Sequence, residues 1–432
     1  MQGSQAVRRL RSILGGSAGN LVEWYDWYAY SACSLYFAPV VFPPASRTAH
    51  LLDAAAVFAV GFFMRPVGGW LFGRYADRRG RRAALTRSVF LMGAGSLLVA
   101  LTPGYARAGL AAPALLVAAR LLQGLSVGGE YGASATYLSE MAGARHRGFW
   151  SSFQYVTLIA GQLLALGVLL VLQRALSAAQ LASWGWRVPF VLGATAALAV
   201  RAFRRGLDET PAFAGAERAG AAQPAARASL RALAAHPRAV ATVVGLTAGG
   251  TVAFYTFTTY AQKFLVNSAG WSSAAATRVS AASLVVFAAA QPLVGLLSDR
   301  VGRRPVLVAF GVLGTLATVP LLGALGTPGV GEGRALLLLV LALLVVSGYT
   351  AVNAVVKAEL FPVEVRALGV GFPYAVAVSV FGGTAEYLAL WARQAGHERW
   401  YFWYVAACVG ASLAVYVGMR ETRDEGTMAG ER

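Results

Sequence analysis

Charged residues are scarce in this chain of 432 residues, in which only 13% are charged and 57% are hydrophobic. A soluble protein carries about twice that charged fraction, so the composition excludes an ordinary soluble domain. The formal net charge of +18 would suit a nucleic-acid ligand if it lay on one polar face. The arginines instead form short clusters between long apolar runs. The sequence therefore predicts a membrane protein that binds no nucleic acid.

Cysteine and histidine are also rare. The two cysteines, Cys33 and Cys408, lie inside apolar segments, which argues against a disulfide framework. The sequence has no metal-ligand spacing, no phosphate-binding glycine loop and no nucleotide-binding motif, so we expect no metal, no cofactor and no enzymatic activity. All four histidines fall in predicted loops, which leaves carboxylates as the candidates to carry protons. The histidines are His50, His146, His236 and His397.

Long apolar runs account for most of the chain. A helix that crosses a bilayer needs about 20 mostly apolar residues, and windows of this length predict an all-α membrane protein with twelve spans. A polar segment separates the first six spans from the last six. The predicted spans are 18–40, 52–73, 83–102, 111–137, 149–173, 186–204, 238–262, 272–297, 305–325, 335–360, 367–391 and 400–419.

Arginine placement predicts the orientation. Clusters such as Arg78 with Arg79 and Arg303 with Arg304 fall in alternate loops, and the loops between them carry few basic residues. By the positive-inside rule the arginine-rich loops face the cytoplasm. We therefore expect a multi-pass protein of a bacterial inner membrane, surrounded by lipid, with both termini cytoplasmic. We expect it to be a monomer.

A ten-residue loop occurs twice. Gly-Arg-Tyr-Ala-Asp-Arg-Arg-Gly-Arg-Arg at 73–82 recurs as Gly-Leu-Leu-Ser-Asp-Arg-Val-Gly-Arg-Arg at 295–304. A second pattern also recurs at about half the chain length, because a glutamate precedes an arginine by seven residues at both Glu140 and Glu359. Two homologous halves are typical of transporters that rock around a central site. The predicted divisions are an N-terminal half at 1–204, a central cytoplasmic loop at 205–237, and a C-terminal half with a short tail at 238–432.

The repeated loop is a candidate conformational gate. Its glycines permit a tight turn between helices. Asp77 or Asp299 could accept hydrogen bonds at a helix N-terminus in the other half, where the helix dipole favours an anion. Such a contact would hold the halves in one state, although the arginines could also serve only as topology anchors. The candidate gate residues are Gly73, Asp77, Arg81, Asp299 and Arg303.

The doubled loop resembles that of the major facilitator superfamily. Further motifs are similar to those of its metabolite:proton symporter family, and similarity extends over both halves. These motifs are Gly-Asn-Leu-Val-Glu-Trp-Tyr-Asp at 19–26, Gly-Phe-Phe-Met-Arg-Pro-Val-Gly-Gly-Trp-Leu-Phe-Gly at 61–73, Arg-Leu-Leu-Gln-Gly-Leu-Ser-Val-Gly-Gly-Glu-Tyr-Gly at 120–132, and Trp-Gly-Trp-Arg-Val-Pro-Phe at 184–190.

This resemblance implies two pseudo-symmetric six-helix halves, alternating access, and proton-coupled uptake of a dicarboxylate such as α-ketoglutarate. The partners would be a small organic anion and protons. Other substrates of such symporters remain open, namely shikimate, citrate, and betaine or proline. A non-transporting membrane sensor is a further alternative, but the central loop at 205–237 is too short to hold a sensor domain.

Charges inside predicted spans are costly and are therefore functional candidates. Glu23 and Asp26 are three residues apart and share a helix face. Counted from the predicted helix ends, Arg65 and Glu130 lie at the depth of Asp26, so a cluster of these residues with Glu23 is geometrically possible. A carboxylate beside an arginine takes up a proton when that arginine is drawn toward an anion. The proton-coupling candidates are Asp26, Glu23 and Glu130, unless they form a static ion-pair lattice.

A dianionic substrate requires buried cations, preferably arginine. Arg65 and Arg120 are two candidates and Lys357 is a third, although an ion pair with Glu359 would also explain a lysine at this position. Lys263 is predicted at the outer end of its span, with its ammonium at the interface. Tyr255 and Tyr260 are expected on one broad face, and Glu386 is a further buried polar candidate, although such residues also join helices. The substrate-binding candidates are Arg120, Arg65, Lys357, Gln154, Tyr155, Gln162, Tyr255, Tyr260 and Asn353.

Overall fold

The computed structural model describes residues 2–79, 81–141, 144–205, 230–362 and 365–428, and these residues form helices and no strand. The first half contains six long helices, joined by short helices and 3-10 turns. The long helices are α1 (Gln2–Val41), α2 (Arg47–Arg79), α3 (Arg81–Leu101), α5 (Ala111–Met141), α6 (Arg147–Ala175) and α8 (Val188–Arg205). The short elements are α4 (Tyr105–Ala108), η1 (Ala144–His146), α7 (Ala178–Ser183) and η2 (Gly185–Arg187).

The second half also has six long helical segments, which we call rods. Three of them are continuous helices and three are interrupted. The continuous rods are α13 (Ser273–Val301), α14 (Arg303–Leu325) and α19 (Glu398–Gly418). The interrupted rods are α11 (Pro237–Tyr255) with η4 (Thr256–Tyr260) and α12 (Ala261–Asn267); α15 (Glu332–Thr350) with α16 (Asn353–Glu359); and α17 (Arg366–Ala377) with η5 (Val378–Gly382) and α18 (Ala385–Gln394). Two short helices flank this half, α10 (Leu230–Ala234) and α20 (Thr422–Glu425).

The exterior of the bundle is apolar. Within the described residues, ten helical segments are long and apolar enough to cross a membrane, and α3 contains a shorter apolar stretch at Thr86–Leu101. Large side chains such as Leu101, Leu316 and Trp403 are 69%, 71% and 64% exposed. Apolar surface on this scale is stable only in lipid. The predicted all-α membrane fold is confirmed.

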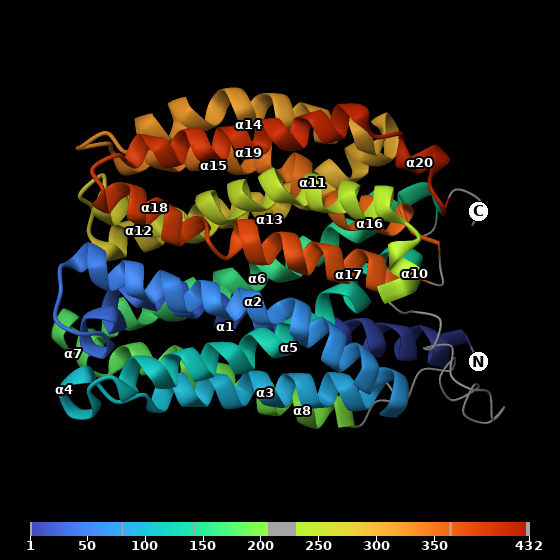
Figure 1. Ribbon diagram of the computed structural model, residues 1–432. Coiled ribbons are helices and arrows are strands. Elements are labelled where there is room, and N and C mark those ends of the chain that lie inside the picture. Colours follow the sequence, from blue (N-terminus) through green and yellow to red (C-terminus); the bar gives the residue numbers. More distant parts are fainter. Residues whose placement is uncertain (1, 80, 142–143, 206–229, 363–364, 429–432) are drawn as a thin grey trace.

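The two halves lie side by side along their length (Figure 1). α2 packs on α5 and α3 on α8 in the first half, as α14 packs on α19 in the second, while α6 on α13 joins the halves. Close approach requires glycine there, because a Cβ at Gly148 would lie 2.7 Å from the Gly295 carbonyl oxygen. Figure 1 places both ends of the chain at one end of the bundle, the terminal side, and we call the opposite end the far side.

Two interrupted rods contain π-helical turns. These turns, η4 and η5, lie between the terminal-side and far-side segments of their rods. A π-helical turn lacks the regular hydrogen-bond ladder and is frequent at functional sites. The residues next to η4 and η5 are therefore candidates for function.

Candidate functional site

Two buried arginines of the first half stack on one tryptophan. The guanidinium carbon of Arg65 on α2 lies 4.3 Å from the ring centre of Trp27 on α1, and that of Arg120 on α5 lies 3.8 Å from it. Arg65 and Arg120 are only 3% and 0% exposed. Aromatic faces attract cations, and this attraction holds two like charges around a single ring.

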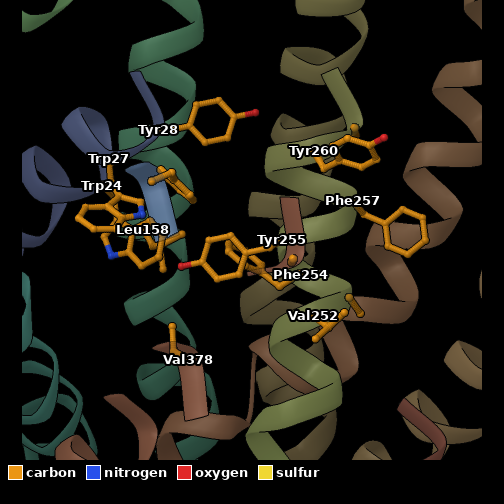
Figure 2. Packing of buried hydrophobic residues seen from close by; sticks show 14 of the residues in the cluster. Trp24, Trp27, Tyr28, Leu158, Val252, Phe254, Tyr255, Phe257, Tyr260 and Val378 are labelled. Carbon is orange, nitrogen blue, oxygen red and sulfur yellow. The ribbon is translucent and has the colours of Figure 1, made fainter. Parts of the chain in front are cut away.

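Much of the hydrogen-bonding capacity of these arginines is unused. Nε and Nη2 of both Arg65 and Arg120 have no partner, and no ion pair among the described residues includes either side chain. The Trp27 indole N–H also lacks a partner, and the Tyr255 hydroxyl lies next to Arg65 without a hydrogen bond of standard geometry. Figure 2 shows the Tyr255 hydroxyl pointing toward Trp24 and Trp27. Buried donors without acceptors are costly, so this group of donors is suited to bind an anion.

A carboxylate lies next to this group. Asp26 is fully buried and accepts hydrogen bonds from the Ser96 hydroxyl of α3 and the Gln123 amide of α5. The Gln123 Oε1 atom in turn accepts a hydrogen bond from Arg120 Nη1 at 2.7 Å. One amide side chain therefore connects the buried carboxylate to the buried guanidinium.

The arginine near Asp26 is Arg120 in the structure, where the predicted cluster had Arg65. Asp26 is connected to Arg120, whereas Arg65 contacts aromatic rings. The depth estimate was wrong because α2 and α5 run to Arg79 and Met141, beyond the predicted ends at 73 and 137. Of the other two predicted members, Glu23 accepts a hydrogen bond of 3.4 Å from Ser126, and Glu130 is buried at 3% exposure.

The second half contributes a buried lysine. Lys357 on α16 is fully buried, and its Nζ atom donates to the Tyr131 hydroxyl at 2.8 Å and lies 3.8 Å from the ring centre of Tyr374. The Tyr131 hydroxyl donates to Asn353 Oδ1 at 3.2 Å. Glu359 pairs with Arg303 instead of Lys357, because residues two apart on a helix point in different directions. Lys357 is thus a buried cation with no carboxylate partner among the described residues.

Three predicted polar side chains of α6 are buried. Gln154, Tyr155 and Gln162 are all nearly inaccessible to solvent. Tyr155 packs edge-on against Phe254 of the second half at 5.6 Å between ring centres. Both side-chain polar atoms of Gln162 lack a partner. α6 therefore carries unused polar groups in the interior.

Tyr255 and Tyr260, which the sequence places on one face of the same span, lie apart in the structure. Tyr255 packs against Phe62 of the first half, whereas Tyr260 packs against Tyr401 within the second half. Figure 2 shows the two hydroxyls pointing in opposite directions. The expectation that the two rings share one face was wrong. Tyr260 follows Tyr255 by five positions, and the chain between them forms the π-helical turn η4, which directs the Tyr260 ring to another side of the helix. Tyr260 lies apart from Tyr255 in this structure, and its role in substrate binding stays a prediction.

Comparison with known families identifies the fold. The sequence matches the sugar (and other) transporter family over residues 13–241 and again over 221–430, which together span both halves. The chain belongs to this family of transporters. The solved structure of the proton:xylose symporter XylE, of the major facilitator superfamily, matches with a TM-score of 0.75 over 99% of both chains at 22% identity. This likeness confirms the major facilitator fold of the transporter.

Curated relatives of the transporter are similar over nearly their whole length. The α-ketoglutarate permease of Escherichia coli is 52% identical over 410 residues, which cover 93% of this chain and 91% of the relative. A citrate-proton symporter of Salmonella typhi is 34% identical, with 86% and 85% covered. The transporter is therefore a multi-pass inner-membrane protein and not an enzyme.

The transporter has one predicted gate contact in the described region. Asp299 at the end of α13 accepts hydrogen bonds from the backbone N–H groups of Gly148 and Phe149 at 2.8 and 2.9 Å. These groups belong to the first turn of α6 in the other half, and Arg303 Nη1 donates to Asp299 at 2.8 Å. The surroundings of Gly73 and the side chains of Asp77 and Arg81 lie outside what the structure describes. The gating role of this contact stays a prediction.

Sequence reasoning misplaced one charged residue of the transporter. Lys263 is fully buried, not interfacial, because its helix continues to Asn267 instead of ending at 262. Its Nζ atom donates to Glu386 Oε1 at 2.5 Å and to Ser31 Oγ at 2.6 Å. The fact that lysine occurs only twice in the chain was the available signal. Ser96 and Gln123 were also missed, since nothing in the sequence separates them from other polar residues of the spans.

Proposed function

We propose that the transporter is a proton-coupled symporter that imports α-ketoglutarate or a similar dicarboxylate by alternating access. The observation that carries this proposal is the set of buried cations without carboxylate partners, with Arg65 in the first half and Lys357 in the second. Two anion-binding positions in opposite halves suit a substrate with a carboxylate at each end. The similarity to the Escherichia coli α-ketoglutarate permease supports the same substrate class.

The proposed binding site lies between the halves. Arg65 and Arg120 hold one carboxylate with their free N–H groups, and Lys357 holds the other. Amide and hydroxyl groups contact the remaining oxygens of the substrate. These groups are those of Gln154, Tyr155, Gln162, Tyr255 and Asn353.

Asp26 is the proposed proton carrier. Its link to Arg120 passes through the Gln123 amide. When a substrate carboxylate attracts Arg120, the Arg120–Gln123 hydrogen bond weakens and Asp26 loses the field of a nearby cation. The neutral, protonated form of Asp26 is then favoured, so anion binding and proton binding support each other. Glu23 and Glu130 remain further candidates for this role.

Alternating access requires contacts that open in turn. We assign the terminal side to the cytoplasm, in agreement with the arginine-rich loops. On that side the contact of Asp299 with the first turn of α6 closes the path in one state and opens in the other. Gly73, Asp77, Arg81 and Arg303 are the other proposed gate residues. We expect the transporter to act as a monomer in lipid.

A zwitterionic substrate is the second candidate. A proline/betaine transporter of Escherichia coli is 30% identical to this chain. A zwitterion offers one carboxylate and one cation, and it would place its cation among Arg65, Arg120 and Lys357. Like charges repel at close range in a dry site, so these residues favour the dianion.

Uptake of labelled α-ketoglutarate into proteoliposomes tests the proposal. With an imposed inward proton gradient, we expect accumulation above the external concentration that a protonophore abolishes. Citrate, shikimate and betaine serve as competing substrates, and empty liposomes as the control. Folded protein that does not take up α-ketoglutarate but accumulates betaine would overturn the proposed substrate class.

A further inference from the structure

A closed triangle of polar groups joins the two halves on the far side. Lys263 Nζ donates to Glu386 Oε1 at 2.5 Å and to Ser31 Oγ at 2.6 Å, and Ser31 Oγ donates to Glu386 Oε2 at 2.9 Å. Ser31 belongs to the first half, whereas the ion pair belongs to the second. The side chains of Lys263 and Glu386 are 0% and 4% exposed. An ion pair is therefore kept dry at the boundary between the halves.

Both charged residues follow an irregular turn of helix. Lys263 lies on α12 just after the π-helical turn η4, and Glu386 lies on α18 just after the π-helical turn η5. Figure 1 shows α12 and α18 at the far side of the bundle, opposite the termini. Because the hydrogen-bond ladder is interrupted at both turns, the far-side segments can shift without moving the rest of their rods.

In these electrostatic surroundings Glu386 is the carboxylate partner of Lys263. Arg120 of the first half acts on Glu386 as a second cation, and the other titratable groups around the pair are neutral hydroxyls and a thiol. These groups are Tyr28, Tyr30, Cys33, Tyr260 and Tyr401. No second carboxylate contacts Lys263 among the described residues. If Glu386 becomes neutral, Lys263 needs a new anion.

A purely structural tie does not require this pair. Burying two charges costs several kcal/mol per ion, and apolar residues of the same size often join helices at least as well. Glu386 also differs from Asp26, whose hydrogen bonds all go to the first half. Protonation of Glu386 weakens a contact between the halves directly, because Ser31 donates to its carboxylate.

We propose that the Lys263–Glu386 pair is a second coupling site, where one proton and one substrate carboxylate bind together. When the far side opens, a proton from water forms an O–H bond on the Glu386 carboxylate. Lys263 keeps its ammonium charge and pairs with the carboxylate of the entering substrate. The ion pair has no net charge before the exchange, and after it the charge of Lys263 is balanced by the substrate carboxylate. With one proton on Asp26 and one on Glu386, a dianion crosses without net charge.

This inference rests on the proposed function and predicts two protons per dianion. Each proton adds about a factor of ten in accumulation per pH unit, since a pH unit and a tenfold ratio are equal in free energy. With the membrane potential clamped at zero and a gradient of one pH unit, we expect a steady-state ratio of about 100 for the wild type. For Glu386→Gln we expect a steady-state ratio of about 10. We also expect a substrate-induced current in this variant, whereas the wild type should show none.

Comparing the uptake rate with the steady-state accumulation ratio distinguishes a role in proton coupling from a structural role. A structural defect slows uptake but leaves the steady-state ratio unchanged, because that ratio depends on the number of protons. We expect Glu386→Gln to keep substrate exchange in the absence of a gradient. Lys263→Met should give the same ratio as Glu386→Gln and, in addition, a higher KM for exchange, because it removes the cation that binds the entering carboxylate.

One control accompanies these variants. Glu398→Gln changes a partly exposed pair with Arg393 on the same side and should change neither ratio nor KM. If Glu386→Gln does not fold, Lys263→Met alone tests the ratio.

The outcomes are distinct. A folded Glu386→Gln or Lys263→Met variant with the wild-type ratio and no current would overturn this inference and leave the proposed function standing. Absence of proton-driven α-ketoglutarate uptake in the wild type would instead overturn the proposed function. A reduced ratio with a current would support the second coupling site.

Discussion

At the scale of single residues, Trp27 brings two like charges together. Each guanidinium next to this ring gains cation–π attraction but keeps most of its N–H groups unused. Gln123 then connects Arg120 to Asp26, so that a carboxylate and an arginine interact without forming a direct ion pair. A direct buried pair would be harder for a substrate to displace.

Asp26→Asn is expected to remove one coupled proton. Because asparagine cannot be protonated at this position, the steady-state accumulation of α-ketoglutarate should fall about tenfold per pH unit of gradient. Exchange without a gradient should persist, since the asparagine can still bond to Ser96 and Gln123. Uptake in proteoliposomes at two external pH values measures both. Unchanged accumulation would exclude Asp26 as a proton carrier.

Lys357→Met is expected to weaken binding of dicarboxylates selectively. Loss of one hydrogen bond to a charged group costs about 1.5–3 kcal/mol, or about 10–100-fold in KM. A 2-oxo acid with a single carboxylate should lose little, because its carboxylate binds at Arg65 and Arg120. Competition by monocarboxylates and dicarboxylates against labelled substrate measures the change. Equal losses for both substrate types would contradict the assignment of Lys357 to the second carboxylate.

At the scale of elements, carboxylates stabilise two helix N-termini on the terminal side. Asp299 accepts from the first backbone groups of α6, and Glu421 accepts from the backbone N–H groups of Arg303 and Arg304 at the start of α14. Anions are favoured at these positions because unpaired N–H groups and the helix dipole meet there. The Asp299 contact joins different halves, whereas the Glu421 contact stays within one.

Asp299→Asn is expected to loosen the terminal side. The variant loses the charge at the start of α6 and the ion pair with Arg303, so we expect a loss of about 1–2 kcal/mol in the free energy of unfolding. Thermal unfolding in detergent measures this loss. Glu332→Gln is a matched control, because its pair with Arg278 is about half exposed and contributes little. Equal melting temperatures for both variants would argue against the contact as a lock.

At the scale of the whole molecule, hydrogen bonds join the halves at both sides. Asp299 reaches α6 on the terminal side, and the Tyr28 hydroxyl donates to the Thr258 carbonyl at 2.8 Å nearer the far side. Transport requires these two sets of contacts to open in alternation, so each must be weak enough to break. Individual hydrogen bonds of this kind meet this condition.

Some of the site could be predicted from the sequence. Arg65, Arg120 and Lys357 were found because a charge inside an apolar run is costly and is seldom present without a function. The connection of Asp26 to Arg120 through Gln123 was not found, because helix ends estimated from hydropathy were wrong, with Gln2 against 18 for the start of α1 and Arg79 against 73 for the end of α2. The burial of Lys263 was missed for the same reason.

The sequence alone determined the membrane environment, the two homologous halves and the charged residues that lie inside apolar segments. Each of these depends on composition and spacing along one segment, where the transfer of apolar side chains into lipid dominates. Only the tertiary structure decided which charges meet. The contacts of Trp27 with two arginines, and of Lys263 with Glu386 and Ser31, bring together helices far apart in the chain. Such contacts depend on the rotation and depth of packed helices, which the hydropathy of single segments does not specify.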